Sequence, residues 1–144
     1  MFNRIVVAVD GSDHAEHALK IACDVARKYG SSLTLVHAPE PVSDPMMAGY
    51  AVVPSQPIKE AIDKAAKEVM DKSEAVLKSE NMTNYETATV HGDPAAAVVK
   101  KAEEVGADLI IMGRRGLGAV SRLLIGSTTT KVAQLADCAV LTVK

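Results

Sequence analysis

Apolar residues along the chain form either short continuous runs or longer segments in which they recur every three or four positions. Runs such as IVVAV and LIIM are typical of strands covered on both faces, and the periodic segments are typical of amphipathic helices. Five strands are expected at residues 4–10, 32–38, 85–90, 108–113 and 138–144. Four helices are expected at residues 12–30, 58–80, 91–106 and near 127–137. Their strict alternation predicts an α/β fold of three layers, α/β/α, with a five-stranded parallel sheet.

Two of these helices carry capping signals at both ends. Asp13 and Glu16 have the spacing of a capping box at the start of the first helix, and Gly30 is placed to end it. Asp93, followed by a proline, is expected to be the N-cap of the third helix, which Gly106 ends.

The segment between the second strand and the second helix differs in composition from the rest of the chain. Residues 39–57 contain five prolines and a glycine, so regular structure is not expected there, and the segment is interpreted as a mobile flap. The periodicity of the helix that follows predicts an inner face made of Ile58, Ile62, Ala65, Val69, Val76 and Leu77.

The polarity of one strand favours one order of the sheet. The common orders for five strands are 3-2-1-4-5 and 2-1-3-4-5. The third strand, YETATV at 85–90, is polar and includes Glu86, so it is expected at an edge. The order 3-2-1-4-5, of Rossmann-like type, is therefore predicted. It makes strands 1 and 4 neighbours, and a ligand is expected beyond their carboxyl ends, where residues 10–12 meet the segment 113–131.

The segment GRRGLGAVSRLLIGSTTTK at 113–131 is rich in glycine. Its glycines allow the backbone to turn or to approach another group closely. The spacing is not G-x-G-x-x-G, and no lysine follows in the register of a P-loop. A Rossmann dehydrogenase and a P-loop NTPase are therefore both disfavoured.

The same segment carries groups suited to an anion. Ser127 and Thr128 open the last helix, whose free amides and dipole favour a phosphate. Arg114 or Arg115 could add a charge-assisted hydrogen bond. The alternative is a plain connection, in which the glycines only make turns and Ser127 is only an N-cap.

The loop matches the pattern G-x2-G-x9-G-[ST], which resembles the nucleotide-binding signature of the universal stress protein family, in its ATP-binding subgroup. The segments IVVAVDGS at 5–12, HGDP at 91–94, DLIIMG at 108–113 and CAVLTVK at 138–144 extend this resemblance over the chain. We therefore expect residues 1–144 to form a single domain of this family.

The resemblance implies an adenine nucleotide site. In the family the first-strand aspartate lies by the ribose or adenine, the end of strand 2 touches the base, and the glycine loop wraps the phosphates. The implied cofactor-binding residues are Asp10, Gly11, Ser12, Val36, Ala38, Met112, Gly113, Arg115, Gly116, Gly126, Ser127, Thr128 and Thr129. The implied cofactors are ATP and Mg²⁺, with Asp10 as the candidate metal ligand through the nucleotide.

The last strand suggests how the chain assembles. The segment AVLTV at 139–143 lacks the charges and prolines that normally protect an exposed edge strand, so a second copy is expected to cover it. The family often dimerises through this element, which also favours a homodimer.

Composition limits the other partners. With 16 basic and 18 acidic residues, a net charge of −2, no Trp and one Phe, nucleic-acid binding is not expected. No apolar stretch is long enough to span a membrane and no secretory segment precedes the first strand, so a cytoplasmic location without membrane association is expected. Cys23 and Cys138 are interpreted as buried thiols.

Three functional classes follow: a nucleotide-dependent regulator in stress response, a slow ATPase or phosphotransfer enzyme, and an interaction module. The pocket of such a module would be empty or hold another adenine nucleotide such as cyclic AMP. The regulator, with an unidentified protein partner, is preferred, because Asp10 is the one expected pocket carboxylate and no catalytic base is evident. We therefore expect slow ATP hydrolysis at most. His37 either lines the base pocket or is a surface or hydrogen-bonded residue.

Overall fold

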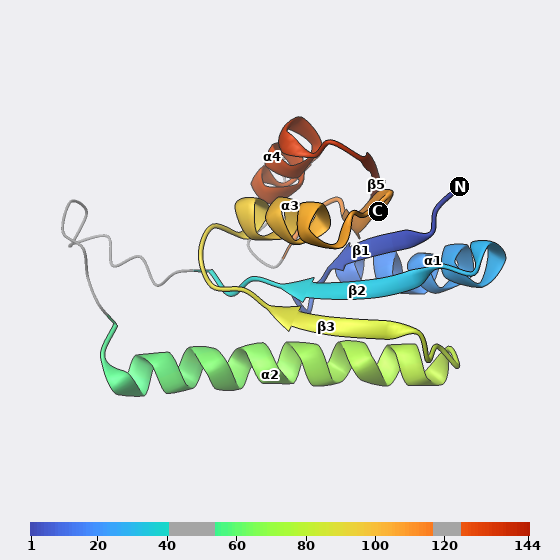
Figure 1. The fold of residues 1–144 in the computed structure, drawn as a ribbon. Helices are drawn as coiled ribbons and strands as arrows, with labels where there is room; N and C mark the ends of the chain where they lie inside the picture. The colour runs from blue at the N-terminus through green and yellow to red at the C-terminus, as the bar shows by residue number, and fades with distance from the viewer. Residues whose placement is uncertain (41–53, 117–124) are drawn as a thin grey trace.

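The structure is a computed structural model that describes residues 1–40, 54–116 and 125–144 (Figure 1). Most of the expected flap at 39–57 lies outside the described residues. The strands are β1 (Arg4–Ala8), β2 (Ser32–His37), β3 (Tyr85–Thr89), β4 (Leu109–Gly113) and β5 (Ala139–Val143). The helices are α1 (Asp13–Tyr29), α2 (Gln56–Ser79), α3 (Pro94–Val105) and α4 (Ser127–Leu135). The predicted alternation of strands and helices is confirmed.

The five strands form one parallel sheet in the order β3-β2-β1-β4-β5, as predicted. In the centre of the sheet, Val7 of β1 is in register with Leu35 of β2 and with Ile111 of β4. The polar strand β3 occupies one edge, where its outer backbone groups can be hydrated. β1 and β4 are neighbours, which places the change of winding direction at their carboxyl ends.

Helices cover both faces of the sheet (Figure 1). Ile5 and Val7 of β1 belong to a core cluster with α1 and α2, whereas Val6 between them belongs to a cluster with α3 and α4. This alternation follows from the two-residue period of a strand. Both faces are apolar because each strand in the middle of the sheet is covered on both sides.

Most of the predicted capping residues of α1 and α3 are confirmed. Gly30, Asp93 and Gly106 occupy the predicted positions, with both glycines in the left-handed conformation. The capping box at Asp13 is wrong, because Ser12 is the N-cap and its hydroxyl accepts a hydrogen bond from the Ala15 amide. A serine hydroxyl directly before the first turn can reach this amide, so the N-cap lies one residue before the predicted Asp13.

The inner face of α2 differs from the prediction in its first half. The buried residues are Ala66, Met70, Ser73 and Leu77, whereas Ile58 is 40 % exposed and Ala65 is also exposed. The physical reason is that the N-terminal part of α2 extends past the carboxyl ends of β2 and β3 (Figure 1), so the sheet cannot cover it. This overhang forms a wall of the pocket described below.

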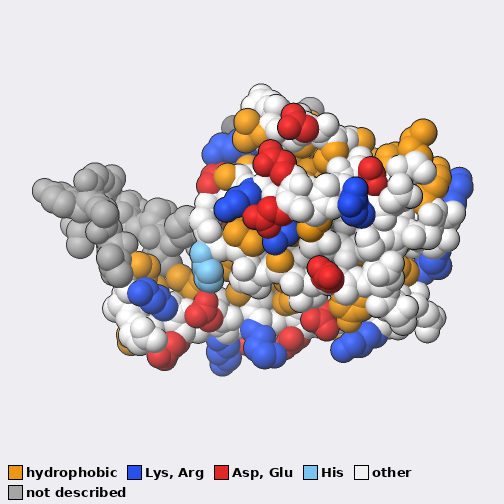
Figure 2. Space-filling view, viewed as in Figure 1, with side chains coloured by type: hydrophobic (Ala, Val, Ile, Leu, Met, Phe, Trp, Pro, Cys, Tyr) orange, Lys and Arg blue, Asp and Glu red, His pale blue; other side chains and the backbone are white. Residues whose placement is uncertain are grey.

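The surface along α2 carries charges of both signs, which alternate along the lower edge of the molecule in Figure 2. Lys67 pairs with Asp71, and Lys78 pairs with Glu74, one helical turn apart. None of the helices in the described ranges is long and apolar enough to cross a membrane. Cys23 is buried as predicted, but Cys138 is only half-buried.

Candidate nucleotide-binding site

A pocket of about 600 Å³ lies at the carboxyl ends of β1, β2 and β4, where the sheet changes its winding direction. Its size is in the range of small-molecule sites. All the predicted site residues except Gly11 and Ser12 line it. The lining also includes Ile62, Ala65, Ala66 and Val69 of α2, and Pro94 and Val98 of α3. The fold therefore brings together segments that lie far apart in the sequence.

Asp10 follows β1 and is held in one orientation. Its Oδ1 accepts hydrogen bonds from the backbone amide of Ser12 at 2.9 Å and from the Ser12 hydroxyl at 2.5 Å. The left-handed conformation of Gly11, with φ of 82°, turns the chain so that these bonds can form. Gly11 and Ser12 therefore lie behind the pocket wall and position the carboxylate that lines it.

Two glycines of the loop after β4 allow close approach. A Cβ at Gly116 would lie 2.5 Å from Oδ2 of Asp10, and a Cβ at Gly113 would lie 2.9 Å from Cβ of His14. No left-handed conformation is required at either position. These glycines are needed because α1 and the carboxylate of Asp10 pack against the loop, and not because of the backbone conformation.

The N-terminus of α4 opens into the same pocket. Gly126 is its N-cap and provides no side-chain cap, while Ser127 and Thr128 line the pocket. Amides in the first turn of a helix have no partner within the helix, so they are suited to bind an anion. Because α4 is nine residues long, its dipole adds to this preference.

Thr129 lies deeper than its neighbours. It is 3 % exposed, and its hydroxyl donates a hydrogen bond of 2.9 Å to the carbonyl of Gly113. The Gly126 amide donates to the Arg114 carbonyl at 2.8 Å. These two bonds connect the end of β4 to the start of α4, and the hydroxyl proton of Thr129 is thereby used within the protein.

The two arginines of the loop have different positions. Arg115 lines the pocket, whereas Arg114 does not, and the Arg114 amide donates to the Val143 carbonyl of β5 at 2.6 Å. Within the part of the chain that the structure describes, the Nε of Arg115 is buried without a hydrogen-bond partner. A buried N–H donor of this kind favours an acceptor from a ligand.

The opposite end of the pocket is mainly apolar. Val36 and Ala38 line it, and Val36 also belongs to the core cluster with α3 and α4. The α2 residues of the lining were not assigned to the site by sequence periodicity. His37 also lines the pocket and is 8 % exposed; its Nδ1 lies 2.8 Å from the carbonyl oxygen of Val9. His37 thus lines the pocket and is hydrogen-bonded, but it is not a surface residue.

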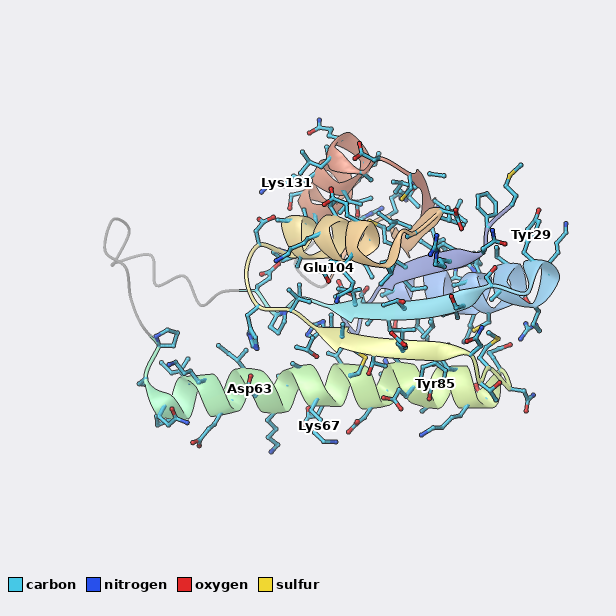
Figure 3. The ribbon with its side chains drawn as sticks, viewed as in Figure 1. Tyr29, Asp63, Lys67, Tyr85, Glu104 and Lys131 are labelled. Carbon is cyan, nitrogen blue, oxygen red and sulfur yellow. The ribbon has the colours of Figure 1, made fainter. Side chains whose placement is uncertain are left out.

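An ion pair joins the two helices at the rim. Lys131, labelled in Figure 3, extends from α4 to Asp93, the N-cap of α3, with 3.3 Å between Nζ and Oδ2. The hydrogen bond from the Ala96 amide and then the Lys131 ammonium hold the pKa of Asp93 below its ordinary value. This pair fixes the N-terminus of α3 beside that of α4.

Carboxylates, histidines and cysteines do not gather into a metal cluster within the described ranges. His14 and His17, one turn apart on α1, thus lack a third ligand there. A metal ion in this pocket would need oxygen atoms from a ligand in addition to Asp10.

Comparison with known proteins agrees with this architecture. The model of the family described as "Universal stress protein family" matches residues 1–144. The chain belongs to the universal stress protein family. It is 38 % identical over 144 residues to the "Universal stress protein in QAH/OAS sulfhydrylase 3'region" of Thermus aquaticus, covering 100 % of both chains.

Solved structures of the family share the fold. UspA of Lactobacillus plantarum is 25 % identical, with a TM-score of 0.82 and coverage of 99 % of this chain and 98 % of that chain. A universal stress protein solved in complex with cAMP is 28 % identical, with a TM-score of 0.74 over 99 % and 97 % of the two chains. One from Archaeoglobus fulgidus in complex with dAMP is 26 % identical, with a TM-score of 0.68 over 100 % and 98 %.

Proposed function

We propose that this protein binds an adenine nucleotide, ATP with Mg²⁺, in the pocket at the carboxyl edge of the sheet and acts as a nucleotide-dependent regulator in stress response. One observation carries the proposal: the Oδ2 of Asp10 lies against Gly116, in a pocket into which the N-terminus of α4 opens. A fixed carboxylate beside a row of free amides suits a molecule with hydroxyl groups next to phosphates.

The two ends of the pocket suggest the orientation of the nucleotide. The apolar end near Val36 and Ala38 suits a base, and Asp10 between the ends suits the ribose hydroxyls. Amides at Ser127 and Thr128, together with Arg115, suit the phosphates. Family members of known structure hold cAMP and dAMP, which supports an adenine nucleotide as the ligand class.

Mg²⁺ would reach the site with the phosphates. It usually takes one or two carboxylates and keeps waters and phosphate oxygens as its other ligands. Asp10 can provide one such carboxylate oxygen, because Ser12 occupies only Oδ1. We therefore propose Asp10 as the single protein ligand and the nucleotide as the source of the remaining charge.

Mass spectrometry of the purified protein after denaturation tests the ligand class directly. We expect an adenine nucleotide in the supernatant, and calorimetry should then give tighter binding for Mg-ATP than for cyclic AMP. Tighter binding of cyclic AMP would favour the second candidate, for which the family member in complex with cAMP is the specific observation. Binding of none of these nucleotides would overturn the proposal.

We propose that ATP turnover is slow. In the described part of the pocket, Asp10 and Glu40 are the carboxylates, and Asp10 is held by Ser12. Phosphoryl transfer needs a positioned base or water-orienting group in line with the γ-phosphate. Hydrolysis at about 10 per second, a typical enzymic rate, would instead favour the enzyme interpretation.

We also propose a homodimer through β5. This strand lies at the edge of the sheet, and the side chains of Leu135 and Leu141 near it are 56 % and 38 % exposed. A second copy could pair its own β5 with this edge about a two-fold axis. A regulatory protein partner would then recognise the dimer and its bound nucleotide.

A further inference from the structure

The rim of the candidate site carries an exposed ion pair. Lys131 of α4 and Asp93, the N-cap of α3, lie 3.3 Å apart between Nζ and Oδ2, and their side chains are 57 % and 50 % exposed. Exposed pairs of this kind contribute little to stability, because water solvates the separated charges almost as well. The lysine can therefore change its partner at little cost to the fold.

Both partners lie next to residues of the pocket lining. Ser127 and Thr128 line the pocket, and Lys131 follows them by four and three residues, so the three share one face of α4. A helical side chain leans towards the N-terminus of its helix, which directs the ammonium towards the amides that open into the pocket. Asp93 precedes Pro94, which also lines the pocket. The pair thus lies between the N-termini of α3 and α4.

These two helix N-termini are equipped differently for an anion. At α3 the carboxylate of Asp93 already accepts a hydrogen bond of 2.9 Å from the Ala96 amide, and Pro94 has no amide hydrogen. At α4 the N-cap is Gly126, which offers no side chain to the free amides. An anionic ligand is therefore attracted to α4 and repelled by the carboxylate at α3. Lys131 places a cation between the two.

We propose that Lys131 exchanges Asp93 for the outermost phosphate of the bound nucleotide and thereby favours nucleoside triphosphates over monophosphates and cyclic monophosphates. This inference rests on the proposed nucleotide binding and specifies its preference for phosphate number. A terminal phosphate carries more than one negative charge at neutral pH, so it is a stronger partner for an ammonium than a carboxylate is. The phosphate of cyclic AMP is bonded to the ribose twice and cannot extend to the rim.

Substitution of the lysine measures its contribution to binding. In calorimetry on the full-length protein at constant Mg²⁺, Lys131→Gln should bind ATP about three- to tenfold more weakly, as expected for one charge-assisted contact at a solvated rim. Binding of adenosine and AMP should stay as in the parent. Lys100→Gln is the matched control, because it removes the same charge from an exposed lysine of α3 that does not line the pocket.

The outcomes of this comparison are distinct. Unchanged ATP affinity in Lys131→Gln, or equal losses for ATP and AMP, would overturn the inference while leaving nucleotide binding itself intact. A parent protein that binds none of these nucleotides would overturn both.

Substitution of the carboxylate separates partner exchange from a structural role. Asp93→Asn keeps a good N-cap but releases Lys131, so ATP should bind about two- to fivefold more tightly than in the parent. In the Lys131→Gln background the same substitution should give a clearly smaller gain. If the pair only held the two helices together, both single substitutions would weaken ATP binding, which would contradict the exchange. An equal gain in both backgrounds would also contradict it, because Asp93 would then act on the phosphates directly.

The carboxyl group of Asp93 gives a readout in the unmodified protein. Its pKa is held below the ordinary value by the Ala96 amide and then by the Lys131 ammonium. If ATP takes Lys131 as its partner, this pKa should rise, whereas adenosine should leave it unchanged. Carbon NMR over a pH titration measures both cases. An Asp93 pKa that is the same with ATP as with adenosine would refute the exchange.

Discussion

Gly116 and Asp10 face each other so closely that a Cβ at position 116 would lie 2.5 Å from Oδ2 of the carboxylate. The other oxygen of Asp10 is held by the amide and the hydroxyl of Ser12. The carboxylate thus cannot turn away without losing two hydrogen bonds. The loop can approach Asp10 this closely only because residue 116 is a glycine.

Gly116→Ala should therefore weaken nucleotide binding strongly, because the new methyl group displaces either the loop or the carboxylate. Stability should fall less, by about 1 kcal/mol, since Gly116 itself is exposed. Calorimetry with Mg-ATP and urea denaturation measure the two effects. The control is Gly116→Ala in an Asp10→Ala background, where the methyl group should cause little further change in stability. An equal loss in both backgrounds would contradict the close approach.

Asp10→Asn keeps an oxygen for Ser12 but removes the charge that the ribose and Mg²⁺ are proposed to use. We expect affinity for ATP to fall by about 1 to 3 kcal/mol, the cost of losing a charge-assisted hydrogen bond. Measuring the same variant with and without Mg²⁺ separates the two roles. If the Mg²⁺ dependence of the parent persists in the variant, the metal is held elsewhere.

Thr129→Val should lower stability by about 1 to 3 kcal/mol, because the buried Gly113 carbonyl loses its donor. ATP affinity should also fall, whereas affinity for adenosine should stay near that of the parent, since the bond positions only the phosphate end. Thr129→Ser, which keeps the hydroxyl, is the matched control. Equal losses for ATP and adenosine would indicate general loosening of the fold instead.

The dimer prediction is tested on the outer edge of β5. The Val143 carbonyl accepts from Arg114 of the inner neighbour, so Val143 and Leu141 direct their backbone groups to β4 and Thr142 directs its groups outward. Thr142→Pro should remove an outward donor and convert the dimer to a monomer that still binds nucleotide. Sedimentation measures this, and a parent protein that is monomeric at micromolar concentration would refute the dimer.

The ion pair at the pocket rim makes stability depend on pH. The pKa of Asp93 is lowered in the folded state, so this carboxylate contributes stability above its unfolded value of 3.8, and that contribution is lost as the pH falls through the folded pKa. Thermal melts from about pH 6 to about pH 2 should show the parent approaching Asp93→Asn below about pH 3.8. A constant difference between the two proteins would exclude this linkage.

The order of the sheet could be predicted from sequence because one strand was polar. Glu86 and its neighbours in β3 could not be buried on both faces, which left an edge as the suitable position. The segments of the pocket could be predicted for a related reason. In a parallel sheet the residues that follow β1 and β4, among them Asp10 and Gly113, meet at one edge.

The parts that sequence did not provide depend on tertiary packing. The periodicity of α2 gives one face but not the point at which the sheet ends, so it could not indicate that Ala65 borders a pocket while Met70 is buried. Likewise, Ser12 and Thr129 have hydroxyls suited to a ligand in the sequence. Only the structure shows that both hydroxyls bond within the protein.

The hydrogen bond from the Arg114 amide to the Val143 carbonyl makes β5 part of the wall that supports the candidate site. During synthesis, the segments that contain Asp10, Gly116 and Ser127 leave the ribosome before this strand does. The loop and α4 thus have their support only once β5 has emerged and paired with β4. A growing chain therefore lacks this support for the pocket, and we expect the proposed nucleotide binding only after β5 has paired with β4.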